Sequence, residues 1–255
     1  MEVVVLGCGT SHGVPMVACS CDVCRSEDPK NHRTRCAIYV TDGESGLLVD
    51  APPELRLQLT RERIERVDAV LLTHTHADHV MGLDDVRRFN ELTGRPMPVY
   101  GRDSTLEDVR RIFAYAFDPS AQQGGGLPSY DLRSVGEELE VGAMRFQIFS
   151  VLHGRMEVLG VRVGGFAYVT DVSEIPPDSW PFLEGLDTLI LDATRREPHP
   201  THFHFDRAVE VAAQIAARQT FFTHLSHDYD YETTVRELPD GVSLAWDGLR
   251  IAVQA

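Results

Sequence analysis

Short apolar runs recur along the chain, and most of them are bounded by glycine or aspartate. Runs such as Glu2–Leu6 and Ala69–Thr73 are rich in valine, leucine and other residues that favour β-strands. This pattern predicts strands at Glu2–Leu6, Cys36–Thr41, Gly46–Asp50, Ala69–Thr73, Pro98–Gly101, Leu139–Val141, Met144–Val151, Leu159–Val163, Phe166–Thr170, Thr188–Asp192, Thr220–Thr223, Ser243–Trp246 and Leu249–Val253.

A helical spacing of apolar residues is seen in four other stretches. It predicts helices over Pro53–Ile64, Leu83–Leu92, Thr105–Ala116 and Asp206–Ala217. Ser104 and Glu107 form a candidate capping box before the third of these helices. Roughly a dozen strands with helices between them predict an α/β fold in which two mixed sheets carry helices on their outer faces.

The composition limits the class of partner. Among 255 residues there are 24 Lys+Arg and 39 Asp+Glu, and the formal net charge is −15. Such a charge disfavours polymeric nucleic acid and anionic membranes as partners. No apolar run approaches the roughly 20 residues that span a bilayer. The chain starts on a strand without a basic leader, so we expect a cytoplasmic protein.

The domain organisation is predicted to be simple. Residues 1–255 fit one domain of ordinary size. The stretch Asp118–Ser129 holds three glycines and two prolines, which indicates a loop, and we interpret it as a loop over a site.

The stretch Thr73–His79 follows an apolar strand and holds four candidate metal ligands: His74, His76, Asp78 and His79. Because His74 and His76 are two positions apart, an extended backbone places both side chains on one face. Asp78 and His79 follow as the chain turns and can serve a neighbouring position. Imidazole suits zinc, manganese and iron, and a carboxylate favours harder cations.

Three more candidate ligands stand at the ends of apolar runs. His153, Asp171 and His224 each directly follow such a run. Strand ends of a layered sheet protein converge on one edge, so residues far apart in the sequence can meet there. Together with the histidine cluster they provide seven ligands for two metal ions.

The cysteines suggest a second metal site. Three of the five cysteines, Cys19, Cys21 and Cys24, lie within six residues of one another. In a cytosolic chain this clustering favours metal ligation, with a disulfide or a reactive thiol as the alternatives. Cys8 and Cys36 lie in predicted strands, where we expect them to be buried and inert.

These motifs together resemble the metallo-β-lactamase superfamily, whose signature H-x-H-x-D-H matches His74 to His79. The chain also resembles the PhnP-like branch of that superfamily, which contains phosphodiesterases. The stretches that carry this second resemblance are Gly7–Pro15, Cys19–Cys24, Thr170–Asp171, Leu191–Thr194 and Thr223–His227. The likeness runs from the first strand to the last and implies an αββα sandwich.

The resemblance also implies a set of metal sites. One active-site ion, Mn2+ or Zn2+, would bind His74, His76 and His153, a second would bind Asp78, His79 and His224, and Asp171 would bridge the two. A structural Zn2+ would bind Cys19, Cys21, Cys24 and His227 in a cysteine-rich loop at about 18–27. Two close ions can share a hydroxide that acts as a nucleophile near neutral pH.

Other residues are candidates for supporting roles. Asp50, which closes an apolar strand, is predicted to hold a ligating histidine, and Asp192 is a weaker candidate for the same role. Catalytic roles are predicted for Asp78 and for a histidine outside the ligand set. His204 is preferred over His202 because His204 and Asp206 match the family's active-site spacing, and His199 and His202 are interpreted as surface residues.

The function implied by the resemblance is hydrolysis of small phosphate diesters of a cyclic, phosphoribosyl type by a dinuclear metal centre. Arg195 and Arg196 are candidates for contact with the substrate phosphate. The alternatives are an ester, lactone or thioester hydrolase on the same scaffold and a non-catalytic metal or nucleotide binder. A homodimer is common in this branch, although no stretch of the sequence specifies one.

Overall fold

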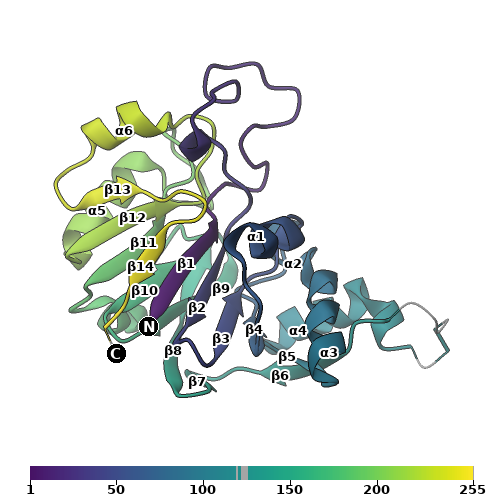
Figure 1. Ribbon diagram of the computed structural model, residues 1–255. Helices are drawn as coiled ribbons and strands as arrows, with labels where there is room; N and C mark the ends of the chain where they lie inside the picture. The colour runs from purple at the N-terminus through teal and green to yellow at the C-terminus, as the bar shows by residue number, and fades with distance from the viewer. Residues whose placement is uncertain (119, 122–125, 255) are drawn as a thin grey trace.

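Two β-sheets face each other in the computed structural model, which describes residues 1–118, 120–121 and 126–254 (Figure 1). The first sheet contains, in spatial order, β14 (Arg250–Ala252), β1 (Glu2–Gly7), β2 (Ala37–Thr41), β3 (Gly46–Val49), β4 (Ala69–Leu71), β5 (Met97–Gly101) and β6 (Tyr130–Ser134). The second contains β13 (Val242–Leu244), β12 (Gln219–Thr223), β11 (Thr188–Asp192), β10 (Phe166–Val169), β9 (Met156–Val163), β8 (Met144–His153) and β7 (Glu138–Val141).

Both sheets are mixed. In the first sheet, β14, β1, β2 and β3 pair antiparallel, whereas β3 to β6 pair parallel. In the second sheet, β10 to β13 pair parallel and β7 to β10 pair antiparallel. Ligands of open α/β sheets bind at the carboxyl ends of the parallel strands. The strand ends of β3, β4, β10, β11 and β12 are therefore where a site is expected.

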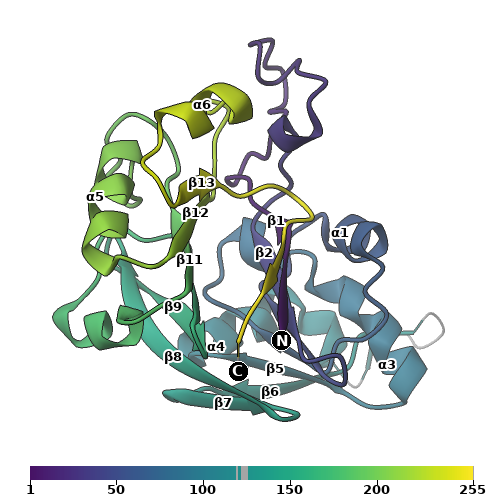
Figure 2. The ribbon, with the colours of Figure 1, turned by 60° about the vertical axis from the view of Figure 1, so that its left-hand side comes forward.

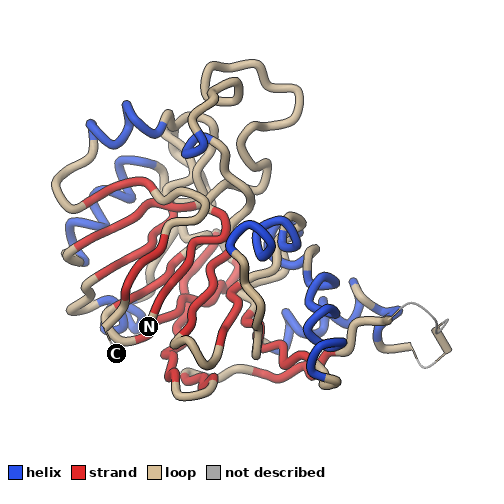
Figure 3. Tube along the Cα trace, viewed as in Figure 1, coloured by secondary structure: helices blue, strands red, loops and turns tan. Residues whose placement is uncertain are grey.

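Helices cover the outer face of each sheet (Figures 2 and 3). Outside the first sheet lie α1 (Leu55–Glu62), α2 (Ala77–Val80), η2 (Leu83–Val86), α3 (Arg87–Thr93), α4 (Asp103–Ile112) and η3 (Ala114–Ala116). Outside the second lie η4 (Pro177–Leu183), α5 (Phe205–Ile215) and α6 (Tyr231–Glu237). The arrangement is an αββα sandwich, so the predicted fold is confirmed.

Three apolar clusters hold these layers together. The central cluster contains side chains of both sheets, including Val40 and Leu47 from the first and Phe146 and Tyr168 from the second. Each of the other two clusters packs one sheet against its helices. Alternate residues of a strand point to opposite faces, so buried strands such as β2 and β10 each supply two clusters.

A long and mostly irregular segment joins β1 to β2 and carries the three clustered cysteines. It extends beyond the sheets next to the segment that leads into α6 (Figures 1 and 2). Its regular structure is the short helix η1 (Pro29–Asn31). Since this segment has few apolar residues, other interactions must fix its position.

Some sequence predictions of secondary structure were wrong. Strand β6 and helices α2 and α6 were missed, because these segments are short and at least half of the residues in each are polar. Helix α4 begins at Asp103, so Ser104 lies inside the helix and the predicted capping box does not form. Of the predicted loop Asp118–Ser129, residues 119 and 122–125 lie outside the described residues. Among the described helices, none is long and apolar enough to cross a membrane.

Candidate metal centre and active site

The candidate ligands of the dinuclear centre meet at the edge of the sandwich where the parallel strands end. His74 follows β4 after a two-residue extension, Asp171 follows β10, and His224 follows β12 directly. His153 ends β8, and Asp78 and His79 lie in the short helix α2. The structure brings all seven predicted residues together in two groups, with Asp171 close to histidines of both: His74, His76, His153 and Asp171, and Asp78, His79 and His224.

Asp171 lies between the two groups. Its Oδ2 is 3.7 Å from Nε2 of His74 and 4.0 Å from Nε2 of His153. Its Oδ1 is 3.3 Å from Nε2 of His79 and 3.5 Å from Nε2 of His224. Each oxygen of the carboxylate therefore faces a different set of imidazoles, as a bridging ligand would.

The spacing of these atoms fits metal ions. Two ligand atoms about 2.1 Å from one tetrahedral ion lie about 3.4 Å apart, close to the separations around Asp171. Nε2 of His74, His79 and His224 is buried without a hydrogen-bond partner. A buried polar atom without a partner is costly, and metal ions bound to the two groups would satisfy all three nitrogens.

Asp50 fixes two of the histidines. Its Oδ2 accepts a hydrogen bond from Nδ1 of His79 at 2.7 Å, and both its oxygens accept from the hydroxyl of Thr73. Because that hydroxyl donates to Asp50, it accepts from Nδ1 of His74 at 3.0 Å. In both rings Nδ1 carries the proton and Nε2 is free to bind a metal ion.

Asp192 repeats this arrangement in the second sheet. Its Oδ2 accepts a hydrogen bond from Nδ1 of His202 at 2.8 Å, and its Oδ1 accepts from the hydroxyl of Thr194. That hydroxyl accepts in turn from Nδ1 of His224 at 3.0 Å. Each of the two aspartates thus holds one histidine directly and a second through a threonine, although the sequence made Asp192 the weaker candidate for this role.

The surroundings shift the pKa values of the histidines in this cluster in different directions. Burial opposes charge on His79, but the carboxylates of Asp171 and Asp50 raise its pKa well above the ordinary value. The same opposition between burial and Asp171 raises the pKa of His224 to about 9. Burial and the neighbouring His79 lower the pKa of His74. Protons and metal ions therefore compete for the buried ring nitrogens.

The structure places His202, and not His204, beside this cluster. The ring centroid of His202 is 4.8 Å from that of His224 and 4.4 Å from that of His153. His204 instead stands at the N-cap of α5, outside both ligand groups. The preference for His204 and the interpretation of His202 as a surface residue are corrected accordingly. The spacing in the sequence could not separate the two histidines. What distinguishes them is the contact of His202 with Asp192, and that contact depends on how the chain folds.

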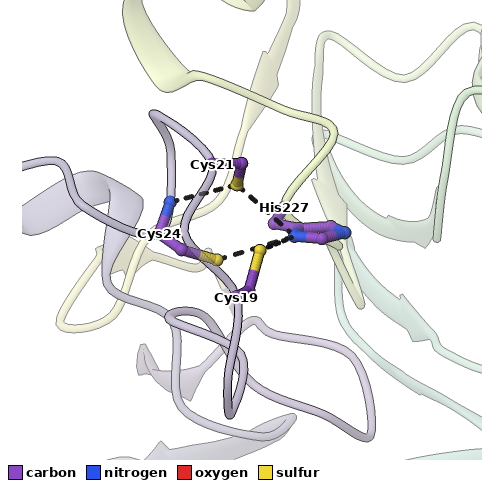
Figure 4. A group of neighbouring side chains, drawn as sticks. All are labelled: Cys19, Cys21, Cys24 and His227. Atoms are coloured by element: carbon purple, nitrogen blue, oxygen red, sulfur yellow. Dashed lines mark hydrogen bonds between the residues drawn. The ribbon is translucent and has the colours of Figure 1, made fainter.

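The four residues predicted to bind a structural zinc also lie together (Figure 4). Nδ1 of His227 is 3.2 Å from Sγ of Cys19 and 3.5 Å from Sγ of both Cys21 and Cys24. Three sulfurs and one ring nitrogen at these separations fit a closed tetrahedral zinc site. By contrast, Cys8 and Cys36 are buried, and burial raises the pKa of both thiols.

A buried arginine, which the sequence analysis missed, links the cysteine segment to the segment that carries His224 and His227. Arg33 is 1% exposed, and its guanidinium donates hydrogen bonds to the carbonyl oxygens of Ser226 at 2.9 Å and Tyr229 at 2.6 Å. Asn31 accepts a third bond from it and donates to Asp230. These bonds hold the two segments together independently of any metal.

We predict that Asp50→Asn weakens metal binding at the dinuclear centre by roughly 10–100-fold, because the carboxylate that holds His79 and Thr73 is lost. Metal affinity is measured by titration of the metal-free protein with Zn2+ in a competing chelator. Asp240→Asn, at an exposed position, is the control. Unchanged affinity in Asp50→Asn would contradict the assigned role.

We predict that Cys21→Ser lowers Tm by roughly 4–8 °C, as expected for a loss of about 2 kcal/mol in a chain of this size. The cause is the loss of one zinc ligand. Zinc content and thermal unfolding are measured together, with Ser20→Ala, at an exposed position between two of the cysteines, as the control. Equal zinc content and equal Tm in Cys21→Ser and the wild type would argue against a structural zinc.

Comparison with known proteins agrees with this geometry. A family model described as the beta-lactamase superfamily domain matches residues 46–225. A solved diphosphatase from the PhnP family is 41% identical, with a TM-score of 0.91 over 99% of this chain and 98% of the other. Zn2+-bound PqqB from Methylobacterium extorquens is 24% identical, with a TM-score of 0.79 over 99% of this chain and 100% of the other, and shows likeness of fold.

A curated relative differs in length. The octanoyltransferase of Porphyromonas gingivalis is 33% identical over 258 residues, which cover 99% of this chain but 52% of that protein. The chain therefore spans about half the length of this relative. From the family model, the fold and the similarity to the PhnP-family diphosphatase, the chain belongs to the metallo-β-lactamase superfamily.

Proposed function

We propose that this protein is a metal-dependent phosphodiesterase that hydrolyses small phosphate diesters. The observation that carries the proposal is the position of Asp171, whose two oxygens face two separate sets of histidines. The superfamily and the PhnP-family neighbour support a metal-dependent hydrolase. Cyclic diesters of a sugar phosphate are the substrates that we favour.

The charge of the centre favours an anionic ester. The ligand set contains two carboxylates, those of Asp78 and Asp171. Two divalent ions would leave a local excess of positive charge in a protein whose formal net charge is −15. Divalent ions, Mn2+ or Zn2+ in our proposal, stabilise negative charge as Lewis acids and activate water. A phosphate diester would be attracted to this local charge.

The chain's own residues orient the reactants. Asp50 and Asp192 fix the ring orientation of the ligating histidines, directly or through Thr73 and Thr194. A site held in one geometry does not have to reorganise when charge develops on the phosphate oxygens. The two aspartates therefore act on catalysis through the residues that they position.

His202 is our candidate for the general acid. Its Nδ1 donates a hydrogen bond to Asp192, which fixes the orientation of the ring and leaves Nε2 as the atom that would pass a proton to the leaving oxygen. Its ring lies against those of His153 and His224. This position is close enough to the centre for contact with a bound diester.

Cys19, Cys21 and Cys24 are free cysteines, and they would have to stay reduced to bind zinc. Because a reducing compartment keeps thiols in this state, we place the activity in the cytoplasm. The active-site substrate is a small molecule in this proposal.

The first test is hydrolysis of bis(p-nitrophenyl) phosphate by purified protein with Mn2+ or Zn2+. We predict that Asp171→Asn and His76→Ala each lower kcat/KM by more than the 10–100-fold typical of losing an outer hydrogen bond to a ligand. Metal content is determined for each protein. Full activity in both variants would refute the site, and faster turnover of a lactone or thioester would favour the alternative hydrolase. Bound metal in the cysteine site alone would favour a non-catalytic binder.

A second prediction concerns His202. We expect His202→Ala to lower kcat by about 10²–10⁴-fold for a diester with an alkyl leaving group, which needs a proton. The loss should be smaller for bis(p-nitrophenyl) phosphate, because p-nitrophenolate leaves without one. His204→Ala is the matched control, and metal content should stay unchanged in both. Equal losses for the two substrates would exclude His202 as the acid.

A further inference from the structure

His76 differs from the other candidate histidine ligands in how its ring is held. In each of the other four rings Nδ1 donates a hydrogen bond, and the acceptors are the hydroxyl of Thr73 for His74, Asp50 for His79, the carbonyl oxygen of Thr201 for His153 and the hydroxyl of Thr194 for His224. Among the described residues, none forms a hydrogen bond or an ion pair with the ring of His76. Something other than a bond to the ring must therefore fix this ligand.

The surroundings of His76 constrain its ring weakly. His76 is the exposed member of its ligand group, and it stands at the N-cap of α2 without a side-chain bond to that helix. Its ring lies against those of His74 and His153, at centroid distances of 4.6 and 5.1 Å. An exposed side chain without a hydrogen bond can change between staggered rotamers. The backbone before His76 consequently decides whether the ring is directed at the centre.

That backbone is anchored to helix α4 through Thr75. The hydroxyl of Thr75 donates a hydrogen bond to Oδ2 of Asp108 at 2.8 Å. Oδ1 of Asp108 accepts from Nη2 of Arg111, which lies one turn further along the helix, at 2.5 Å. Each oxygen of the carboxylate has its own donor, so the group is held in one orientation. A hydrogen bond to a charged acceptor is also stronger than one between neutral groups.

Helix α4 is attached to the strand that carries His153 as well. Arg102, the N-cap residue of α4, donates from Nη2 to the hydroxyl of Ser150 at 2.7 Å and lies 3.3 Å from Oε1 of Glu157. Ser150 lies in β8, three residues before His153. The helix therefore holds, at two points along its length, the segments that carry His76 and His153. These two histidines belong to the same candidate ligand group.

The position of α4 does not depend on the bond to Thr75. Leu106 and Val109 are buried in the apolar cluster that packs the helices on the first sheet. Thr75 itself is half-buried, outside that cluster. Loss of its hydroxyl should leave the fold intact, so a change in metal binding can be attributed to the lost anchor.

The second ligand group has anchors of its own. The carbonyl oxygen of His79 accepts from the backbone N–H of Ala51 at 2.7 Å, and the ring of His79 is bound to Asp50. The ring of His224 is bound to the hydroxyl of Thr194. A change at Thr75 should therefore affect one of the two candidate ions and leave the other in place.

We propose that Asp108 is a positioning residue for His76 and acts on it through the hydroxyl of Thr75. Asp108 belongs to neither of the two ligand groups. Its bond to Thr75 keeps the backbone in the conformation that directs His76 at the ion shared with His74 and His153. The inference rests on the metal centre that the proposed function requires, and it does not depend on the substrate.

The test is equilibrium dialysis of the full chain, loaded with Zn2+ and Mn2+, against graded Mn2+, with bound Mn2+ determined by elemental analysis. Mn2+ is the probe because thiolates favour zinc, so the cysteine site keeps its own ion. We expect two Mn2+ per wild-type chain. In Thr75→Val and in Asp108→Ala the affinity for one of them should fall about 10-fold or more, as is typical when a group that orients a metal ligand is lost. The affinity for the other should not change.

Three further variants separate positioning from a general effect on the structure. Thr75→Ser keeps the hydroxyl and should restore most of the affinity. The double variant Thr75→Val with Asp108→Ala should bind no more weakly than either single variant, because both remove the same bond. Thr60→Val is the matched control and should bind as the wild type does, since it removes a hydroxyl that bonds to the carbonyl oxygen of Arg56 in α1.

Unchanged affinity in Thr75→Val, or equal weakening of both ions, would overturn the proposal. A wild-type chain that binds no Mn2+ would overturn it together with the metal centre. Failure of the proposed function alone would look different: two Mn2+ would bind, with the expected response in Thr75→Val, but bis(p-nitrophenyl) phosphate would not be hydrolysed.

Discussion

The site depends on one buried carboxylate and the imidazoles around it. Asp171 is 2% exposed, and a charge that is removed from water must be compensated by groups of opposite charge. Burial alone would raise its pKa, but His224 and His79 hold that pKa well below the ordinary value. This mutual compensation allows polar residues to fill the edge of an otherwise apolar sandwich. It also leaves the ring nitrogens directed at a common volume, where metal ions would complete the balance.

The backbone at this edge is strained where the functional side chains leave the strands. Asp50, Asp171 and His224 have φ values of 66°, 52° and 59°, in the left-handed region that residues other than glycine rarely adopt. Such a conformation costs about 1–3 kcal/mol and persists when the surroundings determine it strongly. The backbone N–H of Asp50 bonds to Leu71 in the next strand, and that of Leu225 bonds to Cys8. These backbone hydrogen bonds to neighbouring segments help to offset the strain at Asp50 and His224.

The cysteine segment is connected through the same stretch of chain to the edge that carries the candidate ligands. His224 belongs to the dinuclear group and His227 to the cysteine group, three residues apart. Arg33 binds the carbonyl oxygens between and beyond them and keeps this stretch in place. A pocket that Arg195 lines is bounded on one side by this stretch and on the other by the loop that fixes His153. Two candidate metal sites and this pocket therefore share one small set of loops.

The sequence by itself determined the layered sheets and most of the ligand set, because apolar runs that end in histidine or aspartate place polar groups at strand ends. It identified His74 to His79, His153, Asp171 and His224 as candidates that could meet, and the structure brings them together. Only the tertiary structure placed His202, and not His204, beside the candidate ligands, and only it paired Arg196 with Glu237. In each case neighbouring residues have the same chemistry, and the difference lies in distant partners, Asp192 for His202 and Glu237 for Arg196. Contacts of that kind are set by how the sheets and loops pack, which local sequence patterns do not record.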